Sequence, residues 1–483
     1  MIKYVSTRGG ISPVAFDEAI ISGFAADGGL FVPEAIPKIS KAQFQDWSEL
    51  SFTDLAFELL SLFIDPSIIP TADLKKLIDD SYSSFESPDV VDMVPLGDED
   101  RIIIMELFHG PTLSFKDVAM GFLINVLDYL LEKRNKHLSI VLATTGDTGP
   151  AAAWASAGKK TIDCWALFPR GMITEEQERQ MTTLNARNVH AVGVENCPDG
   201  GDDLDFAVAK LFANRELKEE LNLSSVNSIN WCRVMVQSVH YFYGYYRAVE
   251  KVGDEVAFSV PSGAFGNLFG GYLARSMGLP IKKMICVNNV NQALHTVFSS
   301  GVLAKKDLVQ TLSSAIDIVV PYNFWRYLYF SSGRDSEKVS AWMDEFKKNG
   351  QVKLDSETLR AIQNGYASMS ISDSDTKSTI KDTFEKNSGY LLDPHTAVAV
   401  AAANSLKDTL PDQIKIICLA TAHPAKFPDI TRTCLEIGSE LPEQGKHQSL
   451  EKASKVCQQL RLCDLENLEF ALVDAIRTHS RVI

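Results

Sequence analysis

Short apolar runs alternate with longer amphipathic segments from about residue 101 onward. Seven of these runs are predicted to form strands: 101–107, 139–143, 163–168, 189–194, 256–260, 283–287 and 414–419. Between them, segments such as 118–131 and 268–277 repeat apolar residues at intervals of three and four, which is typical of helices that pack against a core. Strands that alternate with helices predict an α/β fold built on a parallel sheet.

The segments on either side of this core have a different character. Residues 1–95 are predicted to form a small N-terminal helical domain, which ends in an acidic, exposed connection over 89–100. The α/β core is expected over 96–435, with a polar insert at about 330–385 whose helices lie over the core rather than in its sheet. The composition of 436–483 predicts a C-terminal helical extension.

The composition is that of an ordinary globular protein. With 45% hydrophobic and 23% charged residues, a chain of 483 residues can bury a large core without metal or disulfide staples. Its 62 acidic residues against 47 Lys and Arg give a net charge of −15, which argues against a nucleic-acid or acidic-membrane partner. The eight cysteines lack Cys-x-x-Cys spacing, no apolar run is long enough for a membrane span, and the N-terminus lacks a signal core. We therefore expect a cytoplasmic protein.

Three loops that follow predicted strands have unusual sequences. Residues 144–149 read Thr-Thr-Gly-Asp-Thr-Gly, residues 261–267 read Pro-Ser-Gly-Ala-Phe-Gly-Asn, and residues 420–424 read Ala-Thr-Ala-His-Pro. In open parallel sheets ligands bind at the carboxyl ends of strands, and a glycine-rich turn into a helix exposes N–H groups that can hold a phosphate or carboxylate. Glycines also serve tight turns for steric reasons alone, so each loop by itself is a weak signal. Neither glycine-rich loop has the spacing of a P-loop or of a dinucleotide fingerprint.

A lysine at the start of a predicted helix indicates the class of chemistry. The segment 106–117 ends a strand, turns and enters a helix at Lys116, which lies between Phe115 and Asp117. Most lysines are solvated surface residues, but here the aromatic neighbour and the positive end of the helix are expected to lower the pKa of the amine. A partly neutral amine is what Schiff-base chemistry requires.

At these positions the chain resembles the threonine synthase family. The matching segments follow in the family's order and spacing: His109-Gly110-Pro111-Thr112 before Phe115-Lys116-Asp117, then Gly146-Asp147-Thr148-Gly149, Ser262-Gly263 before Phe265-Gly266-Asn267, and Thr421-Ala422-His423-Pro424-Ala425-Lys426-Phe427, with 28–33 and 393–397 matching as well. The resemblance runs from the first residues to about 430, and within the family the chain is most similar to the animal threonine synthase-like branch. It implies a fold-type II enzyme, similar to the β subunit of tryptophan synthase, that depends on pyridoxal 5′-phosphate (PLP).

The resemblance also implies roles for individual residues. Lys116 would carry PLP as a Schiff base. The cofactor would be held by Gly263, Ala264, Phe265, Gly266 and Asn267 at its phosphate and by Thr421 at its pyridine nitrogen. The substrate carboxylate and the cofactor's O3′ would be surrounded by Thr144, Thr145, Asp147 and Thr148. The substrate phosphate would be bound by Asn227, Ser228 and Arg233.

At four positions the chemistry of the side chain itself bears on its role. Arg233 suits a phosphate because its planar guanidinium binds bidentately, while the alternative is an ordinary surface salt bridge. The family pattern has Asn where this chain has Ala264, so a side-chain donor beside the cofactor is lost while the backbone cradle is kept. For His109 and His423 we favour hydrogen-bonding roles over catalysis.

The chemistry that the resemblance implies starts from a small amino acid carrying a phosphate ester, and three outcomes stay open. We predict a phospho-lyase that converts O-phosphohomoserine and O-phosphothreonine to 2-oxobutanoate, ammonia and phosphate, because elimination needs fewer controlled steps than addition of water. The alternatives are a true threonine synthase, which turns O-phosphohomoserine and water into threonine and phosphate, and a non-catalytic binding or signalling protein. No metal is expected in the site, and a homodimer is compatible with the fold.

Overall fold

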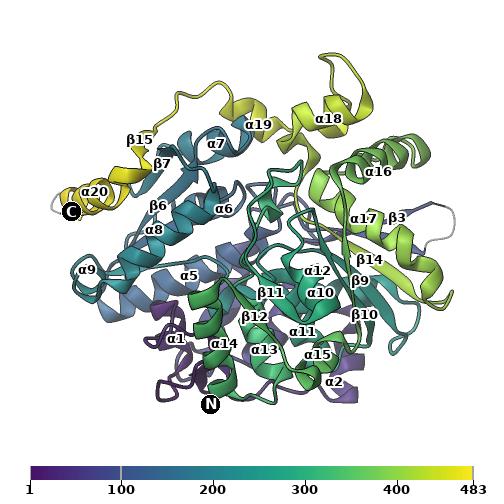
Figure 1. Cartoon of the computed structure of the whole chain (residues 1–483), viewed down its shortest axis with the longest axis horizontal. Coiled ribbons are helices and arrows are strands. Elements are labelled where there is room, and N and C mark those ends of the chain that lie inside the picture. The colour runs from purple at the N-terminus through teal and green to yellow at the C-terminus, as the bar shows by residue number, and fades with distance from the viewer. Residues whose placement is uncertain (1, 98–100, 481–483) are drawn as a thin grey trace.

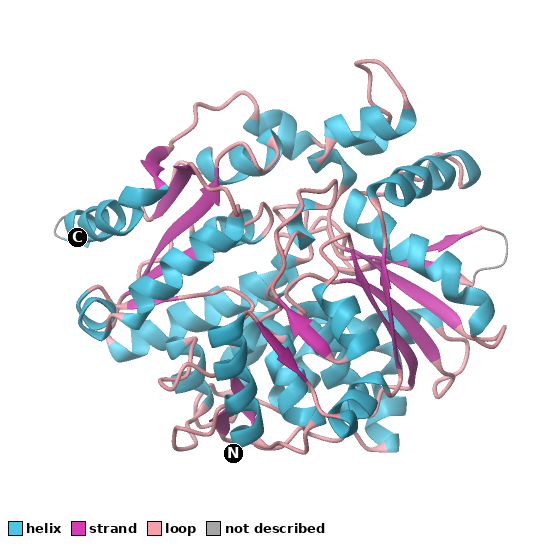
Figure 2. Ribbon diagram, viewed as in Figure 1, coloured by secondary structure: helices cyan, strands magenta, loops and turns pink. Residues whose placement is uncertain are grey.

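Two largely parallel sheets lie on either side of a group of central helices (Figure 1; Figure 2). The computed structural model describes residues 2–97 and 101–480. The first sheet has the order β13-β10-β9-β14-β4-β3 and the second the order β15-β7-β6-β5-β8. The first contains β3 (Asp92–Leu96), β4 (Ile102–Glu106), β9 (Val256–Pro261), β10 (Ile281–Asn288), β13 (Tyr366–Ser370) and β14 (Lys415–Ala420). The second contains β5 (Leu138–Ala143), β6 (Ile162–Pro169), β7 (Val189–Glu195), β8 (Leu223–Ser224) and β15 (Arg461–Asp464).

Within the described residues, every strand pair of these two sheets is parallel except β3–β4. The helices of this part of the chain are α5 (Lys116–Arg134), α6 (Thr148–Ser156), α7 (Glu175–Thr182), α8 (Gly201–Ala213), α9 (Arg215–Glu220), α10 (Trp231–Ala248), α11 (Gly266–Met277), α12 (Ala293–Ser300), α13 (Phe324–Ser331), α17 (Pro394–Leu406) and α18 (Pro428–Leu435). The chain crosses from the first sheet to the second through α5 and returns through α10, and these two helices pack against each other.

Alternate residues of the strands face opposite sides of each sheet. In β4, Ile103 and Met105 belong to the central core, whereas Ile102 and Ile104 face an outer cluster that includes α17. Strand β5 alternates in the same way between the central core and an outer cluster that includes α8. Both faces of each sheet are therefore covered, which explains why the parallel strands read as nearly continuous apolar runs.

All seven strands predicted from the sequence are present, as β4, β5, β6, β7, β9, β10 and β14, and their ends differ from the predicted ones by at most two residues. The two helices predicted over 118–131 and 268–277 are confirmed as α5 and α11. These elements are long or strongly apolar, so their periodicity carries most of the signal.

The N-terminal segment contains strands as well as helices. It forms the helices α1 (Phe16–Ser22), α2 (Lys41–Asp46), α3 (Phe52–Ser61) and α4 (Thr71–Tyr82) and an antiparallel pair of β1 (Tyr4–Ser6) with β2 (Phe31–Pro33). Helix α3 packs against α10 and α4 packs against α5, so this segment shares the central core. The prediction of an exposed connection over 89–100 is wrong where β3 forms, and 98–100 lie outside the described residues. A short, half-exposed edge strand gives little periodic signal.

The polar insert and the tail each add a strand to a sheet, contrary to prediction. Strand β13, inside the insert, pairs in parallel with β10, and β15, inside the tail, pairs in parallel with β7. Both are short edge strands of mixed composition that lie in polar stretches of the chain, so composition did not reveal them. The insert also contains α14 (Ser336–Asn349), β12 (Gln351–Lys353), α15 (Ser356–Gln363) and α16 (Asp373–Lys386), with β12 pairing β11 (Val302–Ala304). The tail continues with α19 (Gln448–Ala453) and α20 (Leu468–Ser480).

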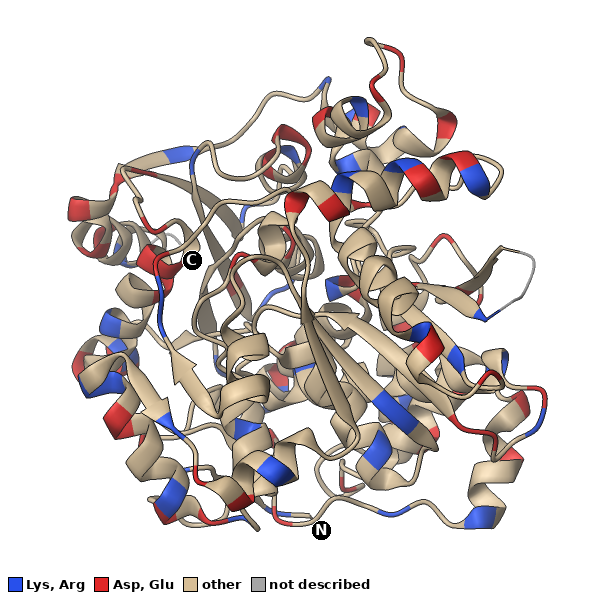
Figure 3. Ribbon diagram, turned by 45° about the vertical axis from the view of Figure 1, so that its right-hand side comes forward, with Lys and Arg blue, Asp and Glu red and all other residues tan. Residues whose placement is uncertain are grey.

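Charged residues of both signs are spread over the peripheral helices and loops, and the central strands carry few of them (Figure 3). None of the helices in the described ranges is long and apolar enough to cross a membrane. Against this background, the few charged side chains that are buried stand out, and three of them, Asp117, Asp147 and Lys426, follow the carboxyl ends of β4, β5 and β14.

Candidate active site

The turn that leads to Lys116 is held against the loop that follows β14. The N–H of Phe115 donates to the carbonyl oxygen of Thr421 at 2.8 Å, and the N–H of His423 donates to that of Leu113 at 3.0 Å. An antiparallel bridge joins the residues between these two bonds. Because α5 begins at Lys116, this pairing brings the lysine beside the Thr421 loop.

The carboxylate of Asp117 closes the same turn. It accepts hydrogen bonds from the N–H of Thr112 at 2.9 Å and from the Thr112 hydroxyl at 2.6 Å. Burial raises the pKa of Asp117 to about 6, although these two hydrogen bonds oppose the shift. A Cβ atom added to Gly110 would lie 2.4 Å from the Asp117 Cβ, so the turn requires glycine there. Asp117 therefore shapes the turn from inside.

The amine of Lys116 is easier to deprotonate than an ordinary lysine. Burial lowers its pKa, the positive charges of Arg233 and Lys426 act in the same direction and Asp147 opposes them, so that the pKa is about 8. Its Nζ lies 4.4 Å from the centre of the Phe115 ring. The direction of the shift is the one expected from the sequence, but its causes are burial and two cations that are distant from Lys116 in the sequence. A lysine with such a pKa can serve as a nucleophile and as a base near neutral pH.

Lys426, to which sequence analysis gave no role, links three loops. Its side chain is fully buried, and its Nζ lies 2.7 Å from Oδ1 of Asp147 and donates to the carbonyl oxygen of Thr112 at 3.0 Å. Gln177 in α7 donates to the same carboxylate oxygen at 3.0 Å. Burial would raise the pKa of Asp147, but Lys426, His395 and Lys116 together outweigh it and hold that pKa below its ordinary value. Asp147 is thus an ionised carboxylate whose Oδ1 is paired with Lys426 and Gln177.

The loop between β5 and α6 is ordered by one hydroxyl. Oγ1 of Thr144 accepts from the N–H groups of Gly146 at 3.1 Å and of Gly149 at 2.9 Å. Thr145 and Thr148 are half-buried in the same loop. The loop thus offers threonine hydroxyls close to Lys116, while Asp147 is already engaged by Lys426.

The loop between β9 and α11 approaches its neighbours too closely for side chains at two positions. A Cβ atom on Gly263 would lie 2.8 Å from Cδ1 of Ile318, and one on Gly266 would lie 3.1 Å from the Ser228 Cβ. Phe265, just before α11, has a left-handed φ of 64°. This conformation turns the chain sharply into the helix, so that N–H groups at the helix start are free for an anion.

The side chain of Asn267 has one hydrogen-bond donor without a partner in the described part of the chain. Its Oδ1 is 2.9 Å from Nε2 of His240, and the backbone carbonyl of Asn267 accepts from the Tyr241 hydroxyl at 2.9 Å. Its Nδ2 is buried and has no hydrogen-bond partner among the described residues. A buried, unpaired amide N–H₂ beside glycine-rich N–H groups is what a bound phosphate would satisfy.

Asn323 joins this loop to the segment before α10. Its backbone N–H and its Nδ2 both donate to the carbonyl oxygen of Ala264 at 3.1 Å, and Nδ2 also donates to Oγ of Ser228 at 2.9 Å. The backbone at Ala264 is therefore firmly held although its side chain is only a methyl group.

Arg326 holds Asn323 and Ser228 in place from within the core. Its side chain is fully buried; Nε donates to the carbonyl oxygen of Phe31 and Nη1 to that of Ser228, each at 3.0 Å. It also donates to the carbonyl oxygen of Ile229 and to Oδ1 of Asn323. The N–H groups of this guanidinium donate to oxygen atoms of the protein, so its role is to position the two loops.

Unlike Arg326, Arg233 has a side-chain N–H group that makes no hydrogen bond to the described residues. It is 1% exposed, and its Nη1 donates to the carbonyl oxygen of Val226 at 2.9 Å. Its Nε has no hydrogen-bond partner, and no carboxylate forms a salt bridge with it in the described ranges. The alternative of an ordinary surface salt bridge is therefore wrong. Asn227 also keeps a buried, unpaired Oδ1.

The two histidines near the lysine turn have structural partners. Nε2 of His109 lies 2.9 Å from Oε2 of Glu106 and 3.2 Å from Oδ2 of Asp92. Nδ1 of His423 accepts from the N–H of Ala425 at 3.1 Å. Both therefore have the hydrogen-bonding roles favoured from the sequence.

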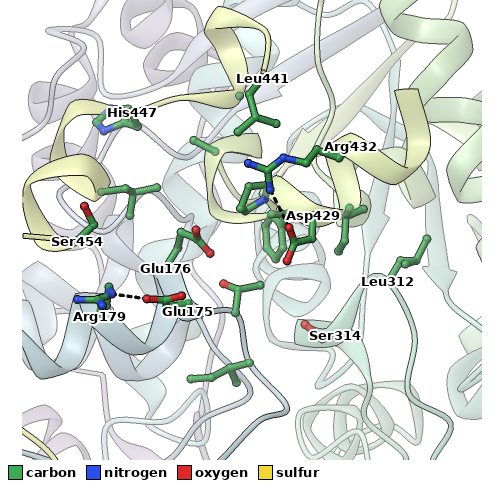
Figure 4. A pocket seen from close by; sticks show the side chains of 18 of the residues that line it. Glu175, Glu176, Arg179, Leu312, Ser314, Asp429, Arg432, Leu441, His447 and Ser454 are labelled. Carbon is green, nitrogen blue, oxygen red and sulfur yellow. Dashed lines mark hydrogen bonds and ion pairs between the residues drawn. The ribbon is translucent and has the colours of Figure 1, made fainter. Parts of the chain in front are cut away.

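An open pocket of about 750 Å³ adjoins Lys426 (Figure 4). Its wall includes the start of α7, residues on either side of Lys426, and part of the tail. The charges that Figure 4 labels are largely paired, with Arg179 2.7 Å from Glu175 and Arg432 2.7 Å from Asp429. The pocket therefore borders the site, and both of the arginines labelled in it are paired with carboxylates.

These features fit PLP. Lys116 offers an amine with a low pKa, and the loop 263–267 offers a close backbone approach with the unpaired Nδ2 of Asn267. The same neighbourhood holds the cations Arg233 and Lys426. One anion loop and one further unpaired arginine are what a phosphorylated cofactor and a phosphorylated substrate would each need.

Comparison with known families agrees with this geometry. Residues 3–82 match the family "Threonine synthase N terminus", 95–422 match "Pyridoxal-phosphate dependent enzyme", and 396–470 match "Threonine synthase, C-terminal". The chain belongs to the threonine synthase family of PLP-dependent enzymes. The family match confirms two predictions made from the sequence, namely that the cofactor is PLP and that the enzyme belongs to the lyase class.

Individual family members cover nearly the whole chain. It is 40% identical to the threonine synthase of Saccharomyces cerevisiae over 96% of both chains, and 40% identical to threonine synthase-like 2 of Xenopus laevis over 89% of both. The crystal structure of threonine synthase from yeast superposes with a TM-score of 0.91, at 37% identity, over 100% of this chain and 99% of that one. PLP-bound threonine synthase from Brucella melitensis gives 0.90 at 35% identity over 100% of both. These structures confirm the prediction of a fold-type II enzyme. The prediction that the chain is most similar to the animal threonine synthase-like branch is not confirmed, because the yeast threonine synthase and the Xenopus laevis threonine synthase-like 2 are both 40% identical to it.

Sequence analysis did not predict the residues that hold other residues of this site in place. Gln177, His240, Asn323, Arg326 and Lys426 lie on elements that local patterns did not connect with Lys116. One signal was available, because Arg326 stands in the run Phe-Trp-Arg-Tyr-Leu-Tyr, where a charge among aromatic residues indicates burial.

We expect borohydride reduction of this protein, loaded with PLP, to attach the cofactor to Lys116, because that amine combines burial with a pKa of about 8. Peptide mapping by mass spectrometry identifies the labelled residue. Lys116→Ala should abolish both labelling and turnover, while Lys282→Ala, a change at a half-exposed lysine, should leave both intact. Label on another lysine of the active wild type would refute the assignment.

We expect Gly266→Val to weaken PLP binding at least tenfold, because its side chain would enter the space beside Ser228 and Asn323. Fluorescence titration of the apoenzyme with PLP measures the affinity, and circular dichroism checks the fold. Gly438→Val is a matched control, since a Cβ there meets nothing within 4 Å. Equal PLP affinity of folded Gly266→Val and wild type would mean that the loop is misassigned.

Proposed function

We propose that this chain is a threonine synthase, which converts O-phosphohomoserine and water to threonine and phosphate. The observation that carries the proposal is Arg233, a buried arginine with a free Nε beside Lys116 and separate from the 263–267 loop. A second anion site of this kind suits a substrate that carries its own phosphate. Similarity to named threonine synthases over the whole chain supports the same activity.

The proposed roles of the residues follow from their surroundings. Bound PLP supplies an electron sink for negative charge that develops on the carbon skeleton of the substrate. Lys116, with its lowered pKa, would accept and return protons at those carbons. Arg233 would hold the substrate phosphate and neutralise charge as it leaves. The threonines of the 144–148 loop would bind the substrate carboxylate, as expected from the sequence.

The competing outcome, a phospho-lyase, uses the same first steps. Both reactions consume one water per O-phosphohomoserine: the synthase places its oxygen on Cβ of threonine, and the lyase places it on the carbonyl of 2-oxobutanoate while ammonia departs. The difference is therefore whether the site controls water addition at Cβ before the product is released.

Two observations favour the phospho-lyase as a second candidate. Ala264 replaces the family's Asn, and the chain is as similar to threonine synthase-like 2 proteins as to the synthases. On this candidate, O-phosphothreonine would also yield 2-oxobutanoate. We rank it second because Asn323 holds the Ala264 carbonyl with two hydrogen bonds, which argues against a loosened cofactor site. The lowered pKa of Lys116 in turn supports a catalytic over a non-catalytic protein.

We expect threonine to be the main product from O-phosphohomoserine, measured by amino-acid chromatography beside a coupled assay for 2-oxobutanoate. Reaction in H₂¹⁸O should place the label in the threonine hydroxyl. Lys116→Ala run in parallel measures non-enzymatic breakdown. Mainly 2-oxobutanoate and ammonia, from this substrate and from O-phosphothreonine, would favour the phospho-lyase instead.

We expect Arg233→Lys to lower kcat/KM for O-phosphohomoserine by about 10- to 100-fold, since a charged hydrogen bond contributes about 1.5–3 kcal/mol. The substitution keeps the positive charge near Lys116 but loses the planar fork. PLP content, read from absorbance, should not change. Arg170→Lys, at a half-exposed arginine paired with Glu195, is the control. Parallel loss of PLP from Arg233→Lys would assign Arg233 to cofactor binding or structural support.

A further inference from the structure

A cluster of histidines surrounds one buried carboxylate where α20 lies against the five-stranded sheet (Figure 1). Asp163 comes from β6, His190 from β7 and His479 from the last turn of α20. Each offers a ligand-type atom, and these three atoms lie within 4.8 Å of one another. His137 approaches the same carboxylate from just before β5.

The carboxylate of Asp163 has only imidazoles as side-chain partners in the described part of the chain. It is 2% exposed, with Oδ1 3.2 Å from Nε2 of His479 and Oδ2 3.4 Å from Nε2 of His137. No lysine or arginine forms a salt bridge with it in the described ranges. A buried charge is ordinarily paired with a cation or bound to a metal ion.

His190 presents a ring nitrogen that nothing in the described residues satisfies. Its ring stacks on Trp165 with centroids 3.9 Å apart, and it meets the His479 ring edge-on at 4.5 Å. Its Nε2 is buried without a hydrogen-bond partner. Stacking fixes the plane of the ring, so the ligand atom is held in place before any ion arrives.

The spacing of these atoms suits a tetrahedral ion. With bonds of about 2.0–2.1 Å from zinc to nitrogen or oxygen, neighbouring ligands lie about 3.3 Å apart. The 3.2 Å separation of His479 from Asp163 is close to this value, and the ligand atom of His190 lies within 4.8 Å of both. Two imidazoles and one carboxylate leave a fourth position open, and an adjoining pocket of about 530 Å³, lined in part by His479 and Asp474, would admit water to it.

We propose that Asp163, His190 and His479 form a binding site for a divalent transition-metal ion of the zinc type. His137 would hold the carboxylate oxygen that does not bind the ion. Arg461 opposes the site with a positive charge, since its guanidinium lies 5.4 Å from the centre of the Trp165 ring. The ligand set favours ions with high affinity for imidazole, such as Zn²⁺, over Mg²⁺ or Ca²⁺, which prefer oxygen ligands.

The ion would fasten the C-terminal helix to the sheet. His479 and Asp163 are 316 positions apart in the sequence, and α20 otherwise meets the sheet through apolar residues such as Leu472 and Ile476. A bond between such distant segments restricts the unfolded chain strongly, so bound metal should stabilise the tail. Catalysis at Lys116 does not require it.

A second cluster in the described residues serves as the matched control. Asp92, Glu106 and His109 also bring three ligand-type atoms together. There, however, Nε2 of His109 already lies within hydrogen-bonding distance of both carboxylates, whereas Nε2 of His190 is buried without a partner in the described residues. The contrast predicts that a metal ion prefers the Asp163 cluster.

The test is titration of the PLP-loaded, chelator-treated protein with Zn²⁺ by calorimetry, with metal content measured after gel filtration. We expect one ion per chain and a rise in Tm. His479→Gln and His190→Gln should each lower the affinity at least about 100-fold and abolish the rise in Tm, with kcat/KM unchanged. His109→Gln should bind as wild type does.

Co²⁺ in place of Zn²⁺ provides a second measurement, because a tetrahedral site with nitrogen and oxygen ligands gives visible absorption that His479→Gln should lose. If His190→Gln does not fold, His479→Gln decides the matter, since its side chain lies near the end of α20. Absence of stoichiometric Zn²⁺ binding by wild type, or binding lost in His109→Gln but kept in His479→Gln, would overturn the proposal.

Discussion

The buried ion pair between Lys426 and Asp147 is the contact on which the site depends. It joins the loop after β14 to the loop after β5, and through Thr112 it also holds the turn before Lys116. These loops belong to different sheets, so one ammonium sets the relation between them at the site. Removing either partner of such a pair leaves a buried charge uncompensated and typically costs about 3–5 kcal/mol. The pair therefore acts as a specific positional lock.

Lys426 also has an electrostatic consequence for the lysine that we assign to the cofactor. With Arg233 it adds to the burial that lowers the pKa of Lys116. The protein as a whole carries a charge of −15, yet its interior places three cationic side chains around one anion-binding region. Net charge reports on the solvated surface, whereas a buried site depends on the few charges that face it.

A second framework holds the two anion loops relative to each other. Arg326 fixes Asn323 and the backbone near Ser228, and Asn323 in turn fixes the carbonyl of Ala264. The loop assigned to the cofactor and the segment assigned to the substrate phosphate are thus parts of one hydrogen-bonded unit. Local glycine patterns predict each loop separately, but this link between them passes through a buried arginine whose sequence neighbours are aromatic.

The sequence by itself determined the seven central strands, the two helices that follow Lys116 and the 263–267 loop, and the location of the lysine at a helix start. Those features depend on periodicity and turn chemistry within about ten residues, which local patterns record. Only the tertiary structure decided that β13 and β15 complete the sheets, because a short edge strand is defined by the strand beside it. It alone also brought Lys426 to Asp147 and Asn323 to Ala264. Burial and pairing across hundreds of residues are properties of the packed chain, and no local pattern contains them.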